Sequence, residues 1–196
     1  MTDKRSVEEW LHVEYETEKN QKSDINEHLH ELKRLAENCL HVTEFGSRFG
    51  ASTKAFLASP VSLRAYDLTI HEPLLKLFKM ARSVGKDVEY IKGDTLNVLI
   101  EETDMLFIDT WHSNAQLRQE LEFHGNKARK YLAFHDTHTY GVRDEQVDWA
   151  SNPNRKAMPG QGLLPAIIDF VIANPHWRFM AHRTNCNGLT VLERRG

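Results

Sequence analysis

Cysteine and long apolar runs are both scarce in this 196-residue chain. Its two cysteines, Cys39 and Cys186, are too few and too far apart for a disulfide framework or a cysteine-rich zinc site. The most apolar window, 163–173, contains a proline and an aspartate and is far shorter than a membrane span. The first ten residues, MTDKRSVEEW, include no apolar stretch, which argues against a secretory signal. We therefore expect a cytoplasmic, globular protein with no membrane partner.

An excess of either charge sign is also lacking. Lysine and arginine together number 25 and aspartate and glutamate 28, which gives a formal net charge of -3. This balance argues against a protein that coats nucleic acid, so we expect no nucleic-acid partner. Hydrophobic residues at 40% and charged residues at 27% are typical of a globular protein. The length predicts a single domain over 1–196.

Short apolar runs alternate with helical segments from residue 40 onward. The runs expected to form strands are 40–45, 62–67, 87–92, 104–109 and 130–136. Helices are expected between them near 49–59, 72–84 and 114–128. This alternation predicts an α/β fold in which helices cover both faces of a parallel sheet. A helix over 162–173 and a hairpin over 176–195 follow, which predicts an antiparallel edge strand in a sheet of seven.

Two further segments flank this predicted core of 40–136. Residues 1–38 are expected to form two helices, because Ser6 with Glu9 and Asp24 with Glu27 match helix N-caps followed by an acid three positions later. The first helix is polar, which favours a homo-oligomer through the N-terminal helices. The segment 139–161 is polar and rich in proline and glycine, and we interpret it as a substrate loop or lid that precedes the terminal unit 162–196.

The loop between the first strand and its helix has two glycines, Gly46 and Gly50. Glycine allows a ligand to approach the backbone, and a helix start offers unpaired N–H groups. The spacing is neither a dinucleotide fingerprint nor a nucleotide P-loop, and a tight turn would require the same glycines. Asp67 closes the second strand, where a carboxylate can accept both hydroxyls of a ribose or cap a turn. Asp94, after the third strand, could accept an exocyclic amine or cap a short helix.

Aspartate and histidine follow the fourth and fifth strands. Asp109 and His112 come after the fourth, and His135, Asp136 and His138 after the fifth. If these strands end near each other, two carboxylates and up to three imidazoles converge, which favours a bound cation or proton transfer. A ligand set rich in oxygen suits magnesium or manganese better than structural zinc. The alternative is that the aspartates orient loops while the histidines are solvated.

Taken in order, these segments resemble the motifs of class I S-adenosylmethionine (SAM)-dependent methyltransferases. VTEFGSRFGASTKAFL (42–57) resembles the first motif, LRAYDL (63–68) the ribose-binding second motif, and YIKGDTLNVL (90–99) the segment that borders the adenine. DMLFIDTWHSNAQLRQELE (104–122) looks like the Asp-x-x-His signature of the small-molecule O-methyltransferase subgroup, which includes macrocin-type and cephalosporin-hydroxylase-like proteins. YLAFHDTHTYG (131–141) resembles that subgroup's fifth strand, where it places metal-binding acids. The resemblance covers about 40–193.

The resemblance implies a Rossmann-like three-layer sandwich and a SAM-dependent methyltransferase that acts on a small-molecule acceptor. It also implies functions for individual residues. The metal-dependent members would hold Mg²⁺ at the positions of Asp109, His135 and Asp136, and His112 or His138 could act as general base. SAM-binding positions by the same resemblance are Glu44, Gly46, Ser47, Gly50, Ser52, Asp67, Asp94, Asp109 and Trp111.

The chain departs from the subgroup's pattern at several of these positions. Arg48 stands where many methyltransferases have a further glycine, and Thr110-Trp111 replaces a small pair of residues. The Pro-Gly-Gly that usually precedes the fifth strand is absent, and His135 replaces an acid. These departures bear more on the metal site than on SAM binding.

Three other functions compete with methyl transfer. A catalytically inactive module that binds SAM or a nucleotide would bind the ligand and form no product. A metal-dependent hydrolase or hydroxylase would use His112, His135 and Asp136 with a later acid such as Asp144 or Asp148. A NAD-dependent dehydrogenase would require the full dinucleotide fingerprint, which the chain lacks.

Overall fold

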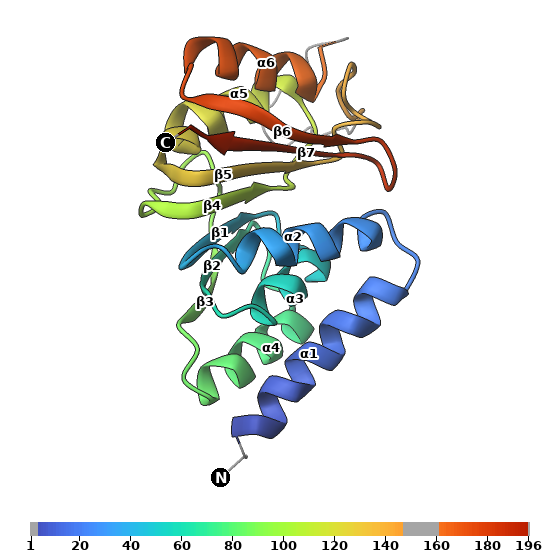
Figure 1. Cartoon of the computed structure of the whole chain (residues 1–196), viewed down its shortest axis with the longest axis vertical. Coiled ribbons are helices and arrows are strands. Elements are labelled where there is room, and N and C mark those ends of the chain that lie inside the picture. The colour runs from blue at the N-terminus through green and yellow to red at the C-terminus, as the bar shows by residue number, and fades with distance from the viewer. Residues whose placement is uncertain (1–3, 147–160, 196) are drawn as a thin grey trace.

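The computed structural model describes residues 4–146 and 161–195. A seven-stranded sheet with the order β3-β2-β1-β4-β5-β7-β6 forms its centre (Figure 1). Strands β1 to β5 are parallel, whereas β7 is antiparallel to both of its neighbours. The strands are β1 (His41–Phe45), β2 (Ser62–Asp67), β3 (Val88–Lys92), β4 (Thr103–Ile108), β5 (Ala128–His135), β6 (Trp177–Arg183) and β7 (Leu189–Arg194).

Helices cover both faces of the sheet, as Figure 1 shows. One face carries α1, α2, α3 and α4, and the other carries α5 and α6. The helices are α1 (Lys4–Asn20), α2 (Leu29–Ala36), α3 (Ala51–Leu57), α4 (Glu72–Ser83), α5 (Asn114–His124) and α6 (Leu163–Ala173), with 3₁₀ turns η1 (Asn26–His28) and η2 (Gly125–Lys127). In the part of the chain so described, no helix has the length and apolarity needed to cross a membrane.

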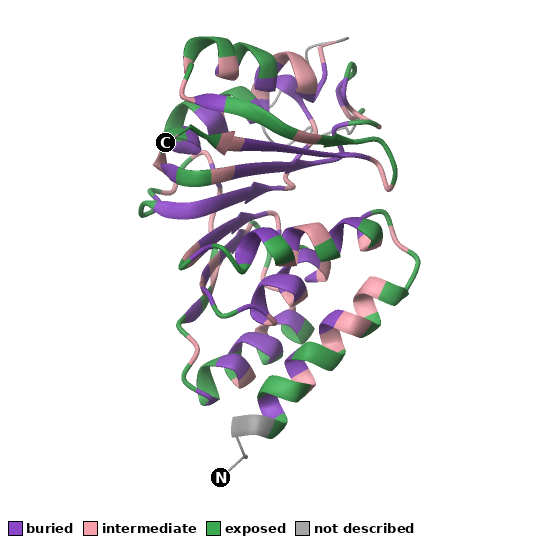
Figure 2. Cartoon of the chain, in the orientation of Figure 1, coloured by how far each residue is buried: buried purple, intermediate pink, exposed green. Residues whose placement is uncertain are grey.

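Two hydrophobic cores lie on opposite sides of the sheet, and strand β4 contributes to both. Its residues are all buried (Figure 2). Because successive side chains of a strand point to opposite faces, Met105 and Phe107 pack toward α2 and α3, whereas Leu106 and Ile108 pack toward α5 and α6. A strand buried on both faces reads as a continuous apolar run, which is the pattern seen at 104–109.

The predicted fold is confirmed, and the predicted strands agree with the observed ones to within about two residues at each end. The hairpin of β6 and β7 supplies the antiparallel edge of the sheet. Strand β7 lies between β5 and β6, so the reversal of direction occurs one strand in from the edge. Of the predicted loop 139–161, residues 147–160 lie outside the described part of the chain.

The N-terminal caps differ from those predicted. Helix α1 already includes Lys4, so Ser6 lies inside the helix and is not its cap. Before η1, the reciprocal hydrogen bonds of a capping box join Ser23 and Asn26 rather than Asp24 and Glu27, while the residue directly before the turn is Ile25. Ser23 Oγ accepts from the N–H of Asn26 at 3.1 Å, and Asn26 Oδ1 accepts from the N–H of Ser23 at 3.1 Å.

Helix α1 also packs against its own chain. Its buried side chains Val7, Leu11 and Tyr15 belong to the core that α3 and α4 share. The narrow apolar stripe of this polar helix is therefore buried within the monomer. A homo-oligomer through the N-terminal helices stays a prediction.

Candidate functional site

A cleft with a volume of about 660 Å³ opens at the carboxyl ends of the parallel strands. It lies where the strand order reverses between β1 and β4, which is where open α/β sheets bind ligands. Six of the residues predicted to bind SAM line this cleft: Gly46, Ser47, Ser52, Asp67, Asp109 and Trp111.

The glycine loop packs directly on the end of β4. Gly46 has a φ of +82°, and a Cβ atom at this position would lie 2.0 Å from the carbonyl oxygen of Asp109. The backbone N–H of Asp109 donates to the carbonyl oxygen of Phe45 at 2.8 Å. Only glycine therefore fits at position 46, and the two loops form one wall of the cleft.

Asp67 both faces the cleft and holds the glycine loop. Its carboxylate accepts hydrogen bonds from the backbone N–H groups of Arg48 at 2.7 Å and Thr69 at 2.9 Å. The two interpretations of Asp67, ligand binding and capping of a turn, are thus compatible.

Glu44 is fully buried behind the glycine loop and is not among the cleft-lining residues. Its carboxyl group accepts hydrogen bonds from the hydroxyls of Ser52 at 2.5 Å and Thr53 at 2.7 Å, at the start of α3. Burial raises the pKa of Glu44 to about 8, against the opposing effect of these two hydrogen bonds. Glu44 therefore positions the first turn of α3, and a direct contact with SAM stays a prediction.

Asp94 and Gly50 likewise lie outside the lining of the cleft. The Asp94 carboxylate accepts from the backbone N–H of Leu96 at 3.1 Å and from Asn97 Nδ2 at 3.2 Å. Asp94 therefore caps the turn that follows it, which is one of the two roles that the sequence allows. Thr95, one residue further, does line the cleft.

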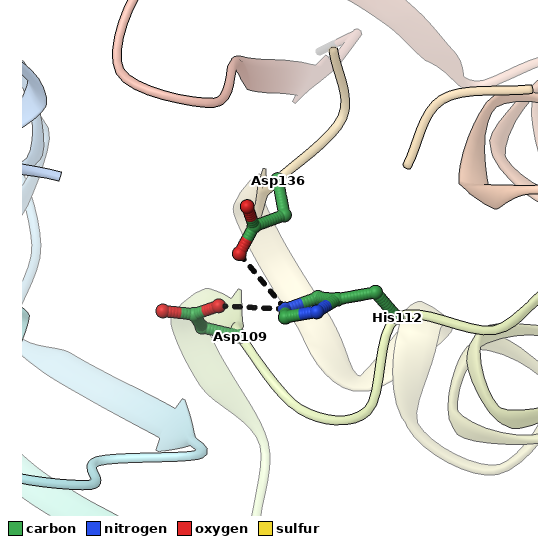
Figure 3. Close-up of side chains that lie close together, drawn as sticks. All are labelled: Asp109, His112 and Asp136. Atoms are coloured by element: carbon green, nitrogen blue, oxygen red, sulfur yellow. Dashed lines mark hydrogen bonds and ion pairs between the residues drawn. The ribbon is translucent and has the colours of Figure 1, made fainter. Parts of the chain in front are cut away.

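Two carboxylates and two imidazoles meet at the ends of β4 and β5. Asp109 follows β4, His112 lies in the loop before α5, and Asp136 follows β5 (Figure 3). His112 Nε2 lies 3.3 Å from Asp109 Oδ1 and 2.9 Å from Asp136 Oδ2. His135 Nδ1 lies 3.4 Å and 3.1 Å from the same two oxygens. The convergence expected from the sequence is present.

These residues fit a metal ion in their geometry and donor chemistry. Asp109, His112 and Asp136 each offer one donor atom, and the three atoms lie within 4.8 Å of one another. Asp136 has a φ of +59°, and its Oδ1 is buried with no hydrogen-bond partner among the residues that the structure describes. An unsatisfied carboxylate oxygen in a buried, left-handed turn is costly unless a ligand uses it.

The electrostatics of this cluster keep both imidazoles charged. Burial lowers the pKa of His112, but hydrogen bonds to Asp109, Asp136 and Glu145 outweigh burial and raise it to about 12. At His135, burial also lowers the pKa, but the adjacent aspartates outweigh burial and raise it to about 11. A protonated His112 cannot accept a proton, so a general base at this position requires loss of that proton and stays a prediction.

Glu145 is a residue of this site that the sequence did not reveal. Its Oε2 lies 3.0 Å from His112 Nδ1, and its backbone N–H donates to the carbonyl oxygen of His112 at 2.8 Å. Glu145 comes from a loop without periodicity. In this loop the sequence suggested Asp144 and Asp148 as metal ligands instead. Only the proximity of the loop to the end of a strand could have indicated Glu145.

The remaining predicted residues lie elsewhere. His138 is exposed and does not line the cleft. Asp144 is buried, and its Oδ1 accepts from the backbone N–H groups of Asn114 and Gly162 at 2.9 Å each, so it acts in the fold rather than in the cluster. Asp148 lies outside the described residues.

No protein-family model and no curated protein matches the chain. Several solved structures do. An O-methyltransferase family protein from Burkholderia thailandensis matches with a TM-score of 0.63 and 13% identity over 88% of this chain and 56% of its own. The N-methyltransferase NodS from Bradyrhizobium japonicum, solved with S-adenosylhomocysteine (SAH), matches with a TM-score of 0.58 and 13% identity over 95% and 99%.

A third structure, an SAH-bound methyltransferase from Podospora anserina, matches with a TM-score of 0.57 and 13% identity over 100% of this chain and 89% of its own. The matching proteins include both O- and N-methyltransferases, so the likeness leaves the acceptor atom open. At these identities the likeness concerns the fold. The chain has the fold of the class I SAM-dependent methyltransferases.

Proposed function

We propose that this protein is a SAM-dependent methyltransferase that acts on an oxygen of a small molecule. The observation that carries the proposal is the shared cleft, which Gly46, Asp67 and Asp109 all line. A volume of about 660 Å³ is in the range of small-molecule sites. Methyltransferase chemistry is also the activity named for the structures that share the fold.

The first half of the cleft suits the cofactor. The backbone at Gly46 and Ser47 would surround the methionine part of SAM, and Asp67 would accept the ribose hydroxyls. Thr95 and Trp111 border the proposed adenine position. In the reaction the bond from the methyl carbon to sulfur breaks, the electron pair stays on sulfur, and a bond from the same carbon to the acceptor oxygen forms. This step requires in-line alignment above all, so the protein's main task is positioning.

The second half of the cleft suits the acceptor. It is bordered by Ser23 and Asp24 from the N-terminal segment, and by Tyr140, Glu145 and Asn187. We assign His112 an electrostatic role here, because its positive charge lies near the place where negative charge develops on the acceptor oxygen. A divalent metal, when bound by Asp109, Asp136 and the deprotonated imidazoles, would replace this positive charge, hold acceptor oxygens and lower the pKa of the hydroxyl.

The test is SAH formation from SAM with a panel of catechols, sugars and polyols. We expect SAH to form with at least one acceptor and to depend on Asp67. SAM binding without SAH formation from any acceptor would instead support the inactive binding module. Metal-dependent hydrolysis of a phosphate ester without SAM would support the hydrolase. A cytoplasmic location and a homo-oligomer remain part of the proposal.

A further inference from the structure

A buried carboxyl group on α5 takes no part in the proposed methyl transfer. Glu120 is fully buried, and its carboxyl group accepts hydrogen bonds from three side chains. Its Oε1 accepts from Thr95 Oγ1 at 2.6 Å and from Gln116 Nε2 at 2.8 Å, and its Oε2 accepts from Thr110 Oγ1 at 2.9 Å. A buried carboxyl group is costly without partners, so these three donors explain how the fold holds an acid at this position.

The two threonines bound by Glu120 come from different segments of the cleft wall. Thr95 lies in the segment that connects β3 to β4, Thr110 follows β4, and both line the cleft. One carboxyl group therefore joins two parts of the wall that are distant in the sequence. His124, one turn further along α5, also holds Thr95, because its Nε2 lies 2.8 Å from the Thr95 carbonyl oxygen.

These hydrogen bonds fix the direction of each hydroxyl hydrogen. Gln116 Nε2 donates to Thr95 Oγ1 at 3.1 Å, so the hydrogen of that hydroxyl points away from Gln116 and toward Glu120. A carboxylate only accepts, so the hydroxyl of Thr110 donates to Glu120 as well. Both hydroxyls then have only lone pairs left. Toward a ligand in the cleft, they can accept a hydrogen bond but cannot donate one.

This polarity bears on which purine the cleft binds. Adenine has an amino group at C6, which donates hydrogen bonds, whereas a 6-oxo purine has a carbonyl oxygen there, which accepts them. An oxo group would face the lone pairs of Thr95 and Thr110 and leave acceptors on both sides unpaired. Asp94, to which the sequence resemblance assigns the adenine, is not among the described residues that line the cleft. The two threonines can supply the acceptor instead.

We propose that Glu120 is a positioning residue that holds the hydroxyls of Thr95 and Thr110 as acceptors toward the cleft, so that the cleft prefers a 6-amino purine to a 6-oxo purine. The inference deepens the proposed function and rests on its assignment of SAM to this cleft. Glu120 acts through the two hydroxyls and not by contact with the cofactor, because it is fully buried and is not among the cleft-lining residues described.

The experiment compares two ligands that differ in the purine alone. Calorimetric titration is carried out with SAH and with S-inosylhomocysteine, in which an oxo group replaces the 6-amino group. The wild-type protein should bind SAH at least about tenfold more tightly than the oxo analogue. Equal affinities for the two ligands would overturn the proposal.

Glu120→Gln tests the positioning role. The amide nitrogen of the glutamine can donate to Thr110 Oγ1, which frees the hydrogen of Thr110 to turn toward the cleft and donate to an oxo group. The ratio of the two affinities should therefore fall at least about threefold, whereas loss of a merely structural residue would weaken both ligands alike. A wild-type ratio in this variant would overturn the proposal. Glu122→Gln, the same change at an exposed position of α5, is the matched control and should keep the wild-type ratio.

Thr110→Val carries the test if the buried Glu120 variant fails to fold. It removes the hydroxyl from a side chain that is only partly buried, so the preference for SAH should decrease. Thr110→Ser retains the hydroxyl and should restore the preference. If Thr110→Val keeps the wild-type ratio, the proposal is wrong.

SAH binding by the wild-type protein separates this inference from the proposed function. If SAH binds and methyl transfer is found while the oxo analogue binds equally well, the inference is wrong and the proposed function stands. If neither ligand binds, the proposed function fails and the inference fails with it.

Discussion

The backbone N–H of Arg48 donates a 2.7 Å hydrogen bond to Asp67 Oδ2, which joins the glycine loop after β1 to the end of β2. Arg48 has a φ of +44°, a left-handed conformation that a residue other than glycine rarely adopts. The bond helps to hold this strained turn, so the carboxylate proposed to bind ribose also shapes the loop proposed to surround methionine.

Replacement of Asp67 should therefore weaken SAM binding in two ways. Asp67→Ala removes the ribose acceptor and leaves the Arg48 N–H without its partner, and we expect a loss of affinity of about tenfold or more. Asp67→Asn retains one acceptor oxygen and should lose less. Calorimetric titration with SAM measures both. Asp94→Ala is the control variant. An equal loss of SAM affinity in this variant would indicate that Asp94 binds the adenine, as the sequence resemblance implies.

The two glycines of the loop should respond differently to alanine. At Gly46 a Cβ would meet the main-chain carbonyl of Asp109 at 2.0 Å, whereas at Gly50 it would meet the end of the Leu74 side chain at 2.6 Å. Both positions have positive φ, which costs about 1–2 kcal/mol for alanine. We expect Gly46→Ala to lose SAM binding and stability, and Gly50→Ala to lose stability mainly by that backbone cost. Thermal denaturation and SAM titration measure both variants, and equal losses of stability and of SAM affinity in the two would contradict this expectation.

Glu44 should make stability fall as the pH rises. Its pKa is about 8 in the folded protein, above the value of 4.5 for an ordinary glutamate. Below pH 4.5 the group is neutral in both states and costs nothing. Between about pH 5 and pH 8 the unfolded chain loses the proton while the folded chain keeps it, so unfolding is favoured by up to about 1.4 kcal/mol per pH unit.

Glu44→Gln isolates this contribution. Glutamine has the shape of the protonated acid and cannot ionise, so the variant should gain stability relative to the wild type as the pH rises to 8. Urea denaturation at several pH values measures the difference. Parallel stability curves for the two proteins would show that Glu44 is not protonated in the folded state.

Asp144 should be important for stability. Its Oδ1 accepts from two backbone N–H groups, at the start of α5 and just before α6. Asp144→Ala leaves both donors without this partner in a buried region, and we expect a loss of about 2–5 kcal/mol in the free energy of unfolding. Asp144→Asn keeps the acceptor oxygen and should lose much less. Similar losses for both variants would indicate that the charge, not the acceptor, is what matters.

The strands were predictable because each is an apolar run with a sharp polar boundary. The run that ends at Asp109 and the run that ends at His135 locate the carboxyl edge of the sheet, and with it the cleft. The caps were less predictable, since Ser23 and Asp24 are adjacent and either could begin a helix. Hydrogen-bond geometry alone distinguishes them.

Within the site, the sequence indicated which residues meet but not how each is used. Asp109, His112, His135 and Asp136 were predictable because parallel strand ends converge. The burial of Glu44 behind the glycine loop could not be predicted, because a strand-terminal acid can point to either side of its loop. Glu145 could not be predicted, since its position depends on a loop anchored by Asp144.

The central claim is tested most directly by calorimetric titration of the protein with SAM and SAH, with NAD as the control. The account predicts that SAM and SAH bind with micromolar affinity or better, that NAD does not, and that Asp67→Ala weakens both. Binding of NAD in place of SAM, or no binding of SAM with or without Mg²⁺, would contradict it.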